Sequence, residues 1–201
     1  GSGKTQLALK LLQDAVKAKQ RCCYVCYNRP LADHLAKLAP AAVEVTTFHQ
    51  FCRDLAERQG EKLDFADPSV FSKMVSDYVD ASESFSKSLD LLIIDESQDF
   101  EPTWAQALLE RLKDTGHLYV MGDTGQQLYE RDMFDLTDAV HIKCMDNFRS
   151  PTKVVQMINA LGLSEEPVVA RSVHTGETPH IYTWAPGQVN SLTALDQSLK
   201  K

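Results

Sequence analysis

The sequence predicts an α/β fold in which a mainly parallel sheet is covered by helices on both faces. Two observations support this prediction. Short apolar segments alternate with amphipathic helical segments as far as residue 161, and residues 91–94 form an uninterrupted apolar run, typical of a strand buried on both faces. Strands that alternate with helices are joined by crossover connections, which make neighbouring strands parallel.

The first elements of the alternation follow one another closely. Apolar residues recur at helical intervals, as in Leu7, Leu11 and Ala15. Pro30 favours the first turn of a helix, where its missing N–H has no helical partner. The expected elements are a helix over residues 5–19, a strand at 22–27, a helix opened by Pro30, a strand at 43–46 and a helix from residue 48.

Residues 60–88 differ in character from the segments on either side. Phe71, Met74 and Tyr78 belong to one helical stripe, and the serine-rich segment 82–88 predicts a flexible hinge. We therefore expect a small helical insertion at 60–88.

The alternation then resumes. The expected elements are a strand at 89–94, a helix begun by Pro102, a strand at 117–121, another near 139–143 and a helix over 151–161. A strand at 181–184 and a polar terminal helix follow. This tail is too short to bury a core of its own, so we expect residues 151–201 to begin a second domain.

Composition excludes several classes of protein. The chain has 201 residues, 43% hydrophobic and 24% charged, as in ordinary globular proteins. It has no apolar run of the roughly 20 residues needed to cross a bilayer, which excludes membrane proteins, and its composition excludes collagen-like and disordered chains. The net charge of −7 argues against coating nucleic acid by bulk electrostatics but is compatible with a narrow groove.

Five cysteines without a regular framework suggest a reducing compartment, and we expect a cytoplasmic protein. Cys22, Cys23 and Cys26 lie in the strand expected at 22–27. Core packing is the stronger interpretation of these three, because no spaced fourth ligand follows for a metal.

The first candidate site is the run Gly-Ser-Gly-Lys-Thr from Gly1 to Thr5, directly ahead of the first helix. Phosphate binding requires free backbone N–H groups in a tight loop, the positive end of a helix dipole and a cation. Glycine permits the loop, Lys4 supplies the charge, and the Thr5 hydroxyl suits Mg²⁺. The full phosphate-loop pattern would extend upstream of Gly1, and a Gly/Ser linker is the competing interpretation.

The second candidate site follows the apolar run 91–94. Asp95 and Glu96 come next, at the carboxyl edge of the predicted sheet, where α/β proteins bind ligands. Asp95 would hold Mg²⁺ through water opposite Thr5, and Glu96 would polarise the water that attacks a γ-phosphate. An acidic helix N-terminus is the alternative, but Lys4 and Thr5 upstream favour the nucleotide site.

Six segments, in order, carry a family resemblance. They are Gly3-Lys4-Thr5, Cys26 to Ala32, Thr47-Phe48-His49, Asp95 to Asp99, Gly122 to Tyr129 and Asn147 to Ser150. Together they resemble the first motor domain of UvrD/Rep-like superfamily 1 DNA helicases over residues 1–150. The resemblance implies a three-layer α/β P-loop NTPase fold of RecA-like type, with a mainly parallel sheet and a small helical insertion.

The resemblance also implies roles around ATP and Mg²⁺. The nucleotide-binding residues would be Gly1, Ser2, Gly3, Lys4, Thr5, Phe148 and Arg149, with Thr5 and Asp95 holding the metal. The catalytic residues would be Lys4, Glu96, Gln126 and Arg149. Phe148 would stack on adenine, Gln126 would sense the γ-phosphate, and Arg149 would place a cation on it. A turn residue and an ordinary surface arginine are the alternatives for Gln126 and Arg149.

For nucleic acid, the resemblance implies contacts from Tyr27, Asn28, Thr47, His49 and Tyr129. Stacking of bases on Tyr27 and Tyr129 would supply roughly 1–3 kcal/mol per base without regard to sequence. The alternatives are core packing for Tyr27, hydrogen bonding at a helix start for His49 and cover of the sheet edge for Tyr129.

The expected organisation is a RecA-like ATPase domain at 1–59 and 89–150, an insertion at 60–88 and the start of a second motor domain at 151–201. The expected function is an ATP-dependent helicase or translocase acting on single-stranded or partially duplex DNA, with RNA left open and no membrane partner. The full-length protein would be the active enzyme, and residues 1–201 alone would turn over negligibly. An ATP-gated regulatory or protein-binding module is the alternative. A P-loop kinase or GTPase is weaker, since neither explains the segments 122–129 and 147–150 together.

Overall fold

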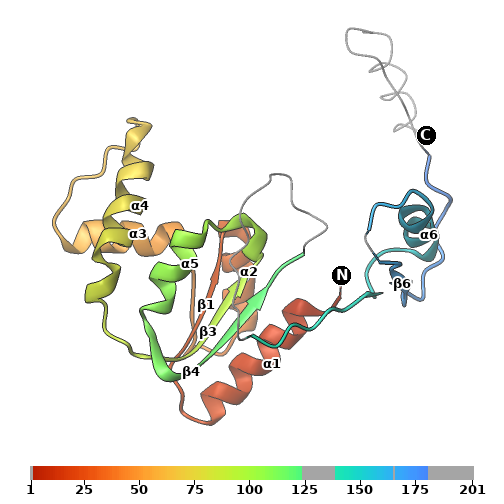
Figure 1. Ribbon diagram of the computed structural model, residues 1–201, viewed down its shortest axis with the longest axis horizontal. Coiled ribbons are helices and arrows are strands. Elements are labelled where there is room, and N and C mark those ends of the chain that lie inside the picture. The colour runs from red at the N-terminus through yellow and green to blue at the C-terminus, as the bar shows by residue number, and fades with distance from the viewer. Residues whose placement is uncertain (1, 124–138, 165, 181–201) are drawn as a thin grey trace, which may run out of the picture. The chain divides into compact units, whose positions relative to one another are not determined.

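The computed structural model describes residues 2–123, 139–164 and 166–180, and the chain divides into two compact units (Figure 1). The larger unit comprises residues 3–142. The smaller unit comprises residues 143–201 together with the first two residues.

Within the described residues, the larger unit is built on a four-stranded parallel sheet with the strand order β2-β1-β3-β4. Its strands are β1 (Cys22–Cys26), β2 (Glu44–Thr47), β3 (Leu89–Asp95) and β4 (Leu112–Met121). Tyr24 lies opposite Val45 and Ile93, and Asp95 lies opposite Met121. The predicted parallel sheet is confirmed.

Helices cover both faces of this sheet (Figure 1). They are α1 (Lys4–Lys17), α2 (Arg29–Leu38), α3 (Phe48–Arg58), α4 (Ser69–Ala81) and α5 (Pro102–Leu109). α1 and α2 pack on the face that carries Tyr24 and Ile93. The other three helices pack on the face that carries Val25 and Ile94. Because side chains alternate along a strand, β1 and β3 contribute to both cores, and the predicted three-layer α/β fold is confirmed.

Two helices begin at residues whose side chains complete the first turn. Asn28 Oδ1 accepts a hydrogen bond from the Leu31 N–H at 3.4 Å, and Thr47 Oγ1 accepts one from the Gln50 N–H at 3.2 Å. Such caps satisfy N–H groups that have no partner within the helix. They fix where the chain leaves β1 and β2 to enter α2 and α3.

The segment expected as an insertion packs on α3 through α4, in which Met74 and Tyr78 are buried. A 3₁₀ helix, Ser82–Ser84, follows, and the Ser82 hydroxyl donates to the Val79 carbonyl at 2.6 Å. The serine-rich segment therefore starts as a hydrogen-bonded turn. The role of residues 60–88 as a separate insertion stays a prediction.

The strand expected near 139–143 is wrong. These residues have no regular secondary structure, and Val140 and Ile142 are 88% and 86% exposed. A β pattern forms a strand only where the backbone pairs and the apolar side chains meet a core. Among the described residues, 139–143 has neither. The strand and helix expected beyond residue 180 lie outside the described residues.

The smaller unit contains β5 (Asp146–Asn147), α6 (Thr152–Ala160) and β6 (Val169–Ala170), with β5 and β6 parallel. The Asn159 side chain donates to the Val168 carbonyl at 2.8 Å and accepts from its N–H at 2.9 Å, which joins α6 to the segment before β6. The helix expected over 151–161 is confirmed. Its place in a second motor domain stays a prediction.

The cysteines behave as core residues. Cys22, Cys23, Cys26 and Cys52 are buried, whereas Cys144 is exposed, and all five are free thiols. Burial raises the pKa of Cys26 and Cys52 to about 12, so both are protonated at neutral pH. Core packing of the β1 cysteines is confirmed.

In the parts of the chain that the structure covers, no helix has both the length and the apolar character that crossing a membrane would require.

Ile93→Ala is expected to lower the free energy of unfolding by about 2–5 kcal/mol, because Ile93 is fully buried and its truncation leaves a cavity. Val140→Ala is expected to change it by less than about 0.5 kcal/mol, because that side chain is exposed. Denaturant unfolding of both variants measures the difference. Equal losses would contradict the surface position of residues 139–143.

Candidate functional site

The candidate residues of the larger unit gather at the carboxyl edge of the sheet. From β1 the chain moves to β2 on one side and later returns to β3 on the other, so the strand order reverses between β1 and β3. Open α/β sheets bind ligands in the crevice outside the carboxyl ends of strands at such a switch point. Tyr27, Thr47, Asp95 and Gly122 lie at or directly after the ends of the four strands.

Lys4 begins α1 and reaches this edge. Gly3, directly before it, has a φ of 89°, a left-handed conformation that glycine adopts without strain. Lys4 Nζ donates to the Gly122 carbonyl at 3.1 Å, and Gly122 follows Met121, the residue opposite Asp95 in the sheet. The ammonium group of Lys4 and the end of β3 are therefore neighbours.

Asp95 is a buried carboxylate, 2% exposed, at the last position of β3. The Tyr24 hydroxyl donates to its Oδ2 atom, and the Glu96 N–H donates to its Oδ1 atom at 2.9 Å. Burial raises the pKa of Asp95 above its ordinary value, although these two hydrogen bonds and the charge of Lys4 act in the opposite direction. Tyr24 is a contact that sequence reasoning missed, because its partner lies on another strand.

The loop after β3 is fastened to the loop after β4. Glu96 has a φ of 52°, and Gln98 Nε2 donates to its Oε2 atom at 2.7 Å. The carbonyl oxygen of the same Gln98 side chain accepts from the Asp123 N–H at 3.1 Å. A Cβ atom at Gly122 would overlap the Ser97 hydroxyl, so glycine permits this close approach. The Gln98 bridge gives a role to a residue of the 95–99 segment to which the sequence alone assigned none.

These residues fit a nucleoside triphosphate with Mg²⁺. In the described chain no side chain caps the start of α1, which leaves the N–H groups of its first turn for an anion. Lys4 adds a cation, and Asp95 is hydrogen-bonded by Tyr24, which packs in the same core as α1. Thr5 lies in this first turn. Gly1 lies outside the described residues, and Ser2 groups with the smaller unit.

The residues expected to contact nucleic acid divide into two kinds. The side-chain oxygens of Asn28 and Thr47 cap α2 and α3, so each has a structural task. Tyr27 and His49 are aromatic neighbours, with ring centroids 5.4 Å apart. Tyr27 is 44% exposed, which contradicts the core alternative for this ring. Burial lowers the pKa of His49, which favours the neutral imidazole.

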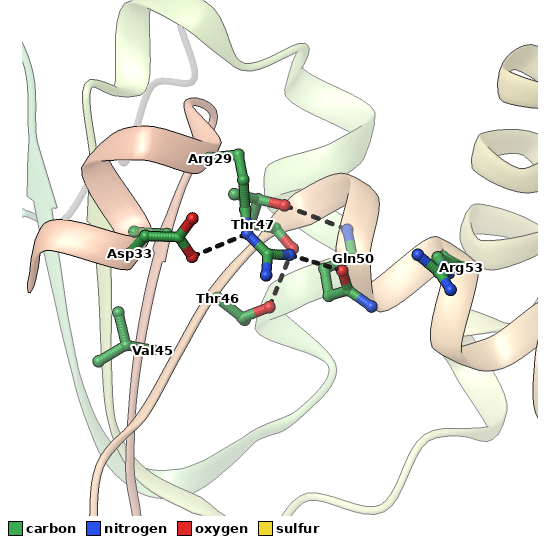
Figure 2. Close-up of a pocket in the computed structure, with 8 residues that line it drawn as sticks. Arg29, Asp33, Val45, Thr46, Thr47, Gln50 and Arg53 are labelled. Atoms are coloured by element: carbon green, nitrogen blue, oxygen red, sulfur yellow. Dashed lines mark hydrogen bonds and ion pairs between the residues drawn. The ribbon is translucent and has the colours of Figure 1, made fainter. Parts of the chain in front are cut away.

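A polar groove of about 360 Å³ lies beside these residues, between α2, β2 and α3 (Figure 2). Arg29 donates to Asp33 and to Gln50, both at 2.8 Å, and Arg53 donates to Glu57 at 2.7 Å. The two arginines of the groove are thus matched by carboxylates of their own helices. Arg29 joins the start of α2 to the start of α3, which is a structural role.

The remaining candidates lie outside the described part of the larger unit. Gln126 and Tyr129 lie outside the described residues. Phe148, 58% exposed, and Arg149 belong to the smaller unit, where Asn147 Oδ1 accepts from the N–H groups of Arg149 and Ser150 at 3.0 and 2.9 Å. The roles of these four candidates at a nucleotide or nucleic-acid site stay predictions.

A parallel sheet, an uncapped helix start with a lysine and a buried acidic residue at the neighbouring strand end together define a P-loop nucleotide-binding domain. A family model described as an AAA domain matches residues 1–132. The chain therefore belongs to this family, AAA_19, a P-loop AAA-type domain found in UvrD/Rep-like helicases. No curated protein matches the chain.

Protonation of His49 is expected to weaken the fold. Because its folded-state pKa lies below the ordinary value of 6.5, the unfolded chain binds this proton more readily. Neutral His49 therefore makes its full contribution to the free energy of unfolding above about pH 6.5, and this contribution is lost as the pH falls below that value. His49→Gln should reduce the fall in melting temperature between pH 7.5 and pH 5.5, measured by circular dichroism.

His34→Gln is the matched control, because His34 is an exposed residue of α2. It should keep the wild-type dependence on pH. An identical slope in all three proteins would contradict the assigned environment of His49.

Proposed function

We propose that the chain is the first motor domain, followed by the start of the second, of a UvrD/Rep-like ATP-dependent DNA helicase or translocase. The observation that carries this proposal is the convergence of Lys4 with Asp95 and Glu96 at the edge where Tyr27 is exposed. A nucleotide site and an aromatic platform on adjacent strand ends are what a nucleic-acid motor requires. The domain bounds proposed above, 1–59 with 89–150, 60–88 and 151–201, belong to this proposal.

At the nucleotide, the N–H groups at the start of α1 and the Lys4 ammonium would bind phosphate oxygens. Thr5 and Asp95 would hold Mg²⁺, which supplies charge neutralisation at the phosphates when bound. Glu96 would orient and deprotonate the attacking water, and its hydrogen bond from Gln98 would fix the carboxylate for this task.

Two residues of the smaller unit have proposed roles at the nucleotide. Phe148 would stack on the adenine, and Arg149 would act as an arginine finger supplied within the same chain. Gln126 would relay the state of the γ-phosphate towards the nucleic acid. Closure and opening of the cleft between the two motor domains would then move the protein along its track.

On the nucleic-acid side, Tyr27 would offer its exposed ring to a base, and Tyr129 would offer a second ring. Asn28, Thr47 and His49 would form hydrogen bonds to the backbone or the bases of the nucleic acid. Single-stranded DNA is the proposed track.

Lys4→Ala or Glu96→Gln is expected to reduce ATP hydrolysis by the full-length protein by at least about 100-fold, because each removes a group that acts on the reacting phosphate or water. Steady-state phosphate release, with and without single-stranded DNA, is the measurement. The matched controls are Lys10→Ala, an exposed lysine of α1 paired with Asp14, and Glu101→Gln, an exposed residue before α5.

Wild-type turnover in either site variant would remove the catalytic assignment. Equal rates of wild-type hydrolysis with and without DNA would contradict the motor.

Binding of oligo(dT) by the full-length protein is expected to weaken as salt rises, because contacts to phosphates release counterions. A plot of log affinity against log salt should have a slope of about −0.7 for each phosphate contact. Fluorescence anisotropy measures it. An ATP-gated protein-binding module, which the net charge of −7 would suit, shows no measurable oligonucleotide affinity at any salt concentration.

A further inference from the structure

A cluster of aromatic rings joins three elements at the carboxyl edge of the sheet. Tyr27 follows β1, His49 lies in the first turn of α3, and Trp104 lies in the first turn of α5. The rings of Tyr27 and Trp104 are parallel to within 1°, with centroids 6.3 Å apart. His49 stands edge-on to both, at 5.4 Å from each centroid. Each ring therefore restricts the orientation of the other two.

Trp104 is the fixed member of this cluster. It is 8% exposed, stacks on the buried ring of Phe48 at 4.8 Å and meets Phe100 edge-on at 6.4 Å. Tyr27, in contrast, is 44% exposed. A ligand at this edge can touch Tyr27, whereas the indole is covered. Trp104 can act on such a ligand only through the rings that it supports.

We propose that Trp104 is a positioning residue for single-stranded DNA, holding the Tyr27 ring and the His49 imidazole in the orientation in which a base can stack. This inference rests on the proposed function, because Tyr27 and His49 are its nucleic-acid contacts. An exposed tyrosine without a support changes rotamer freely, and binding must then immobilise it. A ring already held parallel to the indole is ordered before the base arrives, which strengthens binding without a new contact to DNA.

The test is the affinity of the full-length protein for fluorescein-labelled oligo(dT), measured by anisotropy. Tyr27→Ala should weaken binding about 5- to 150-fold, the range for loss of one stacking ring. Trp104→Leu should weaken it about 3- to 10-fold, in line with loss of aromatic pairing. Trp104→Phe keeps a smaller ring and should give an intermediate loss of about two- to threefold.

A double-mutant cycle separates positioning from general destabilisation. If Trp104 acts through Tyr27, Trp104→Leu should cost little further affinity in a Tyr27→Ala protein. Phe51→Leu is the matched control, because Phe51 is a buried ring of the same core that stacks on Tyr78 and has no ring contact with Tyr27 or His49 among the described residues. It should lower the melting temperature as Trp104→Leu does but leave oligo(dT) affinity unchanged.

The outcomes distinguish the inference from the function on which it rests. The positioning role would be overturned if Trp104→Leu bound oligo(dT) with wild-type affinity. It would also be overturned if Trp104→Leu reduced affinity equally in the wild-type and Tyr27→Ala proteins. Either result would leave the helicase assignment intact. Unchanged binding in Tyr27→Ala, or no binding by the wild type, would overturn the proposed nucleic-acid site itself. If Trp104→Leu does not fold, the same cycle is measured with Trp104→Phe. Its smaller loss of affinity should vanish in the Tyr27→Ala protein, and a loss that persists there would overturn the positioning role.

Discussion

The burial of β3, a strand that ends in a carboxylate, is the constraint on which the site depends. Leu92, Ile93 and Ile94 are at most 1% exposed, and they carry Asp95 to the carboxyl edge at 2% exposure. A carboxylate at this depth is costly unless its oxygens are hydrogen-bonded, and here the Tyr24 hydroxyl and the Glu96 N–H each bind one oxygen. Burial still raises its pKa. A perturbed acid at a ligand-binding edge is typical of a functional site.

The sequence was informative where local pattern and tertiary environment agree. The run 91–94 predicted a strand and Pro30 predicted a helix start, because an uninterrupted apolar run and a proline are both visible in the local sequence. Residues 139–143 alternate apolar and polar side chains as a strand would, but they have no pairing partner in the described chain, which no local pattern reveals. Trp104 falls in the helix that Pro102 predicts, but its support of Tyr27 depends on a contact between distant segments.

Asn28 and Thr47, two of the nucleic-acid candidates, can each be explained either by a helix cap or by a contact with nucleic acid. Asn and Thr are preferred at helix starts, and Asn28 and Thr47 cap α2 and α3. Their presence at strand ends therefore needs no ligand to explain it. Tyr27 has no comparable structural explanation, because nearly half of its surface is exposed and the indole covers only part of the ring. The case for a nucleic-acid surface consequently depends more on the rings than on the polar residues beside them.

The loop after β3 connects the acidic residues of the candidate nucleotide site to the helix that carries Trp104. The Gln98 side chain donates to the Glu96 carboxylate and accepts from the N–H of Asp123, so Gln98 links the acidic residue to the loop after β4. The loop ends at Phe100, which is buried and packs edge-on to Trp104. The 3₁₀ turn Ser97–Asp99, Phe100 and Glu101 separate Glu96 from the helix that carries the indole. In a motor of the proposed kind, a shift of Glu96 with the state of the nucleotide would move the short turn that follows it, and the buried ring of Phe100 at the end of that turn contacts the indole that supports Tyr27.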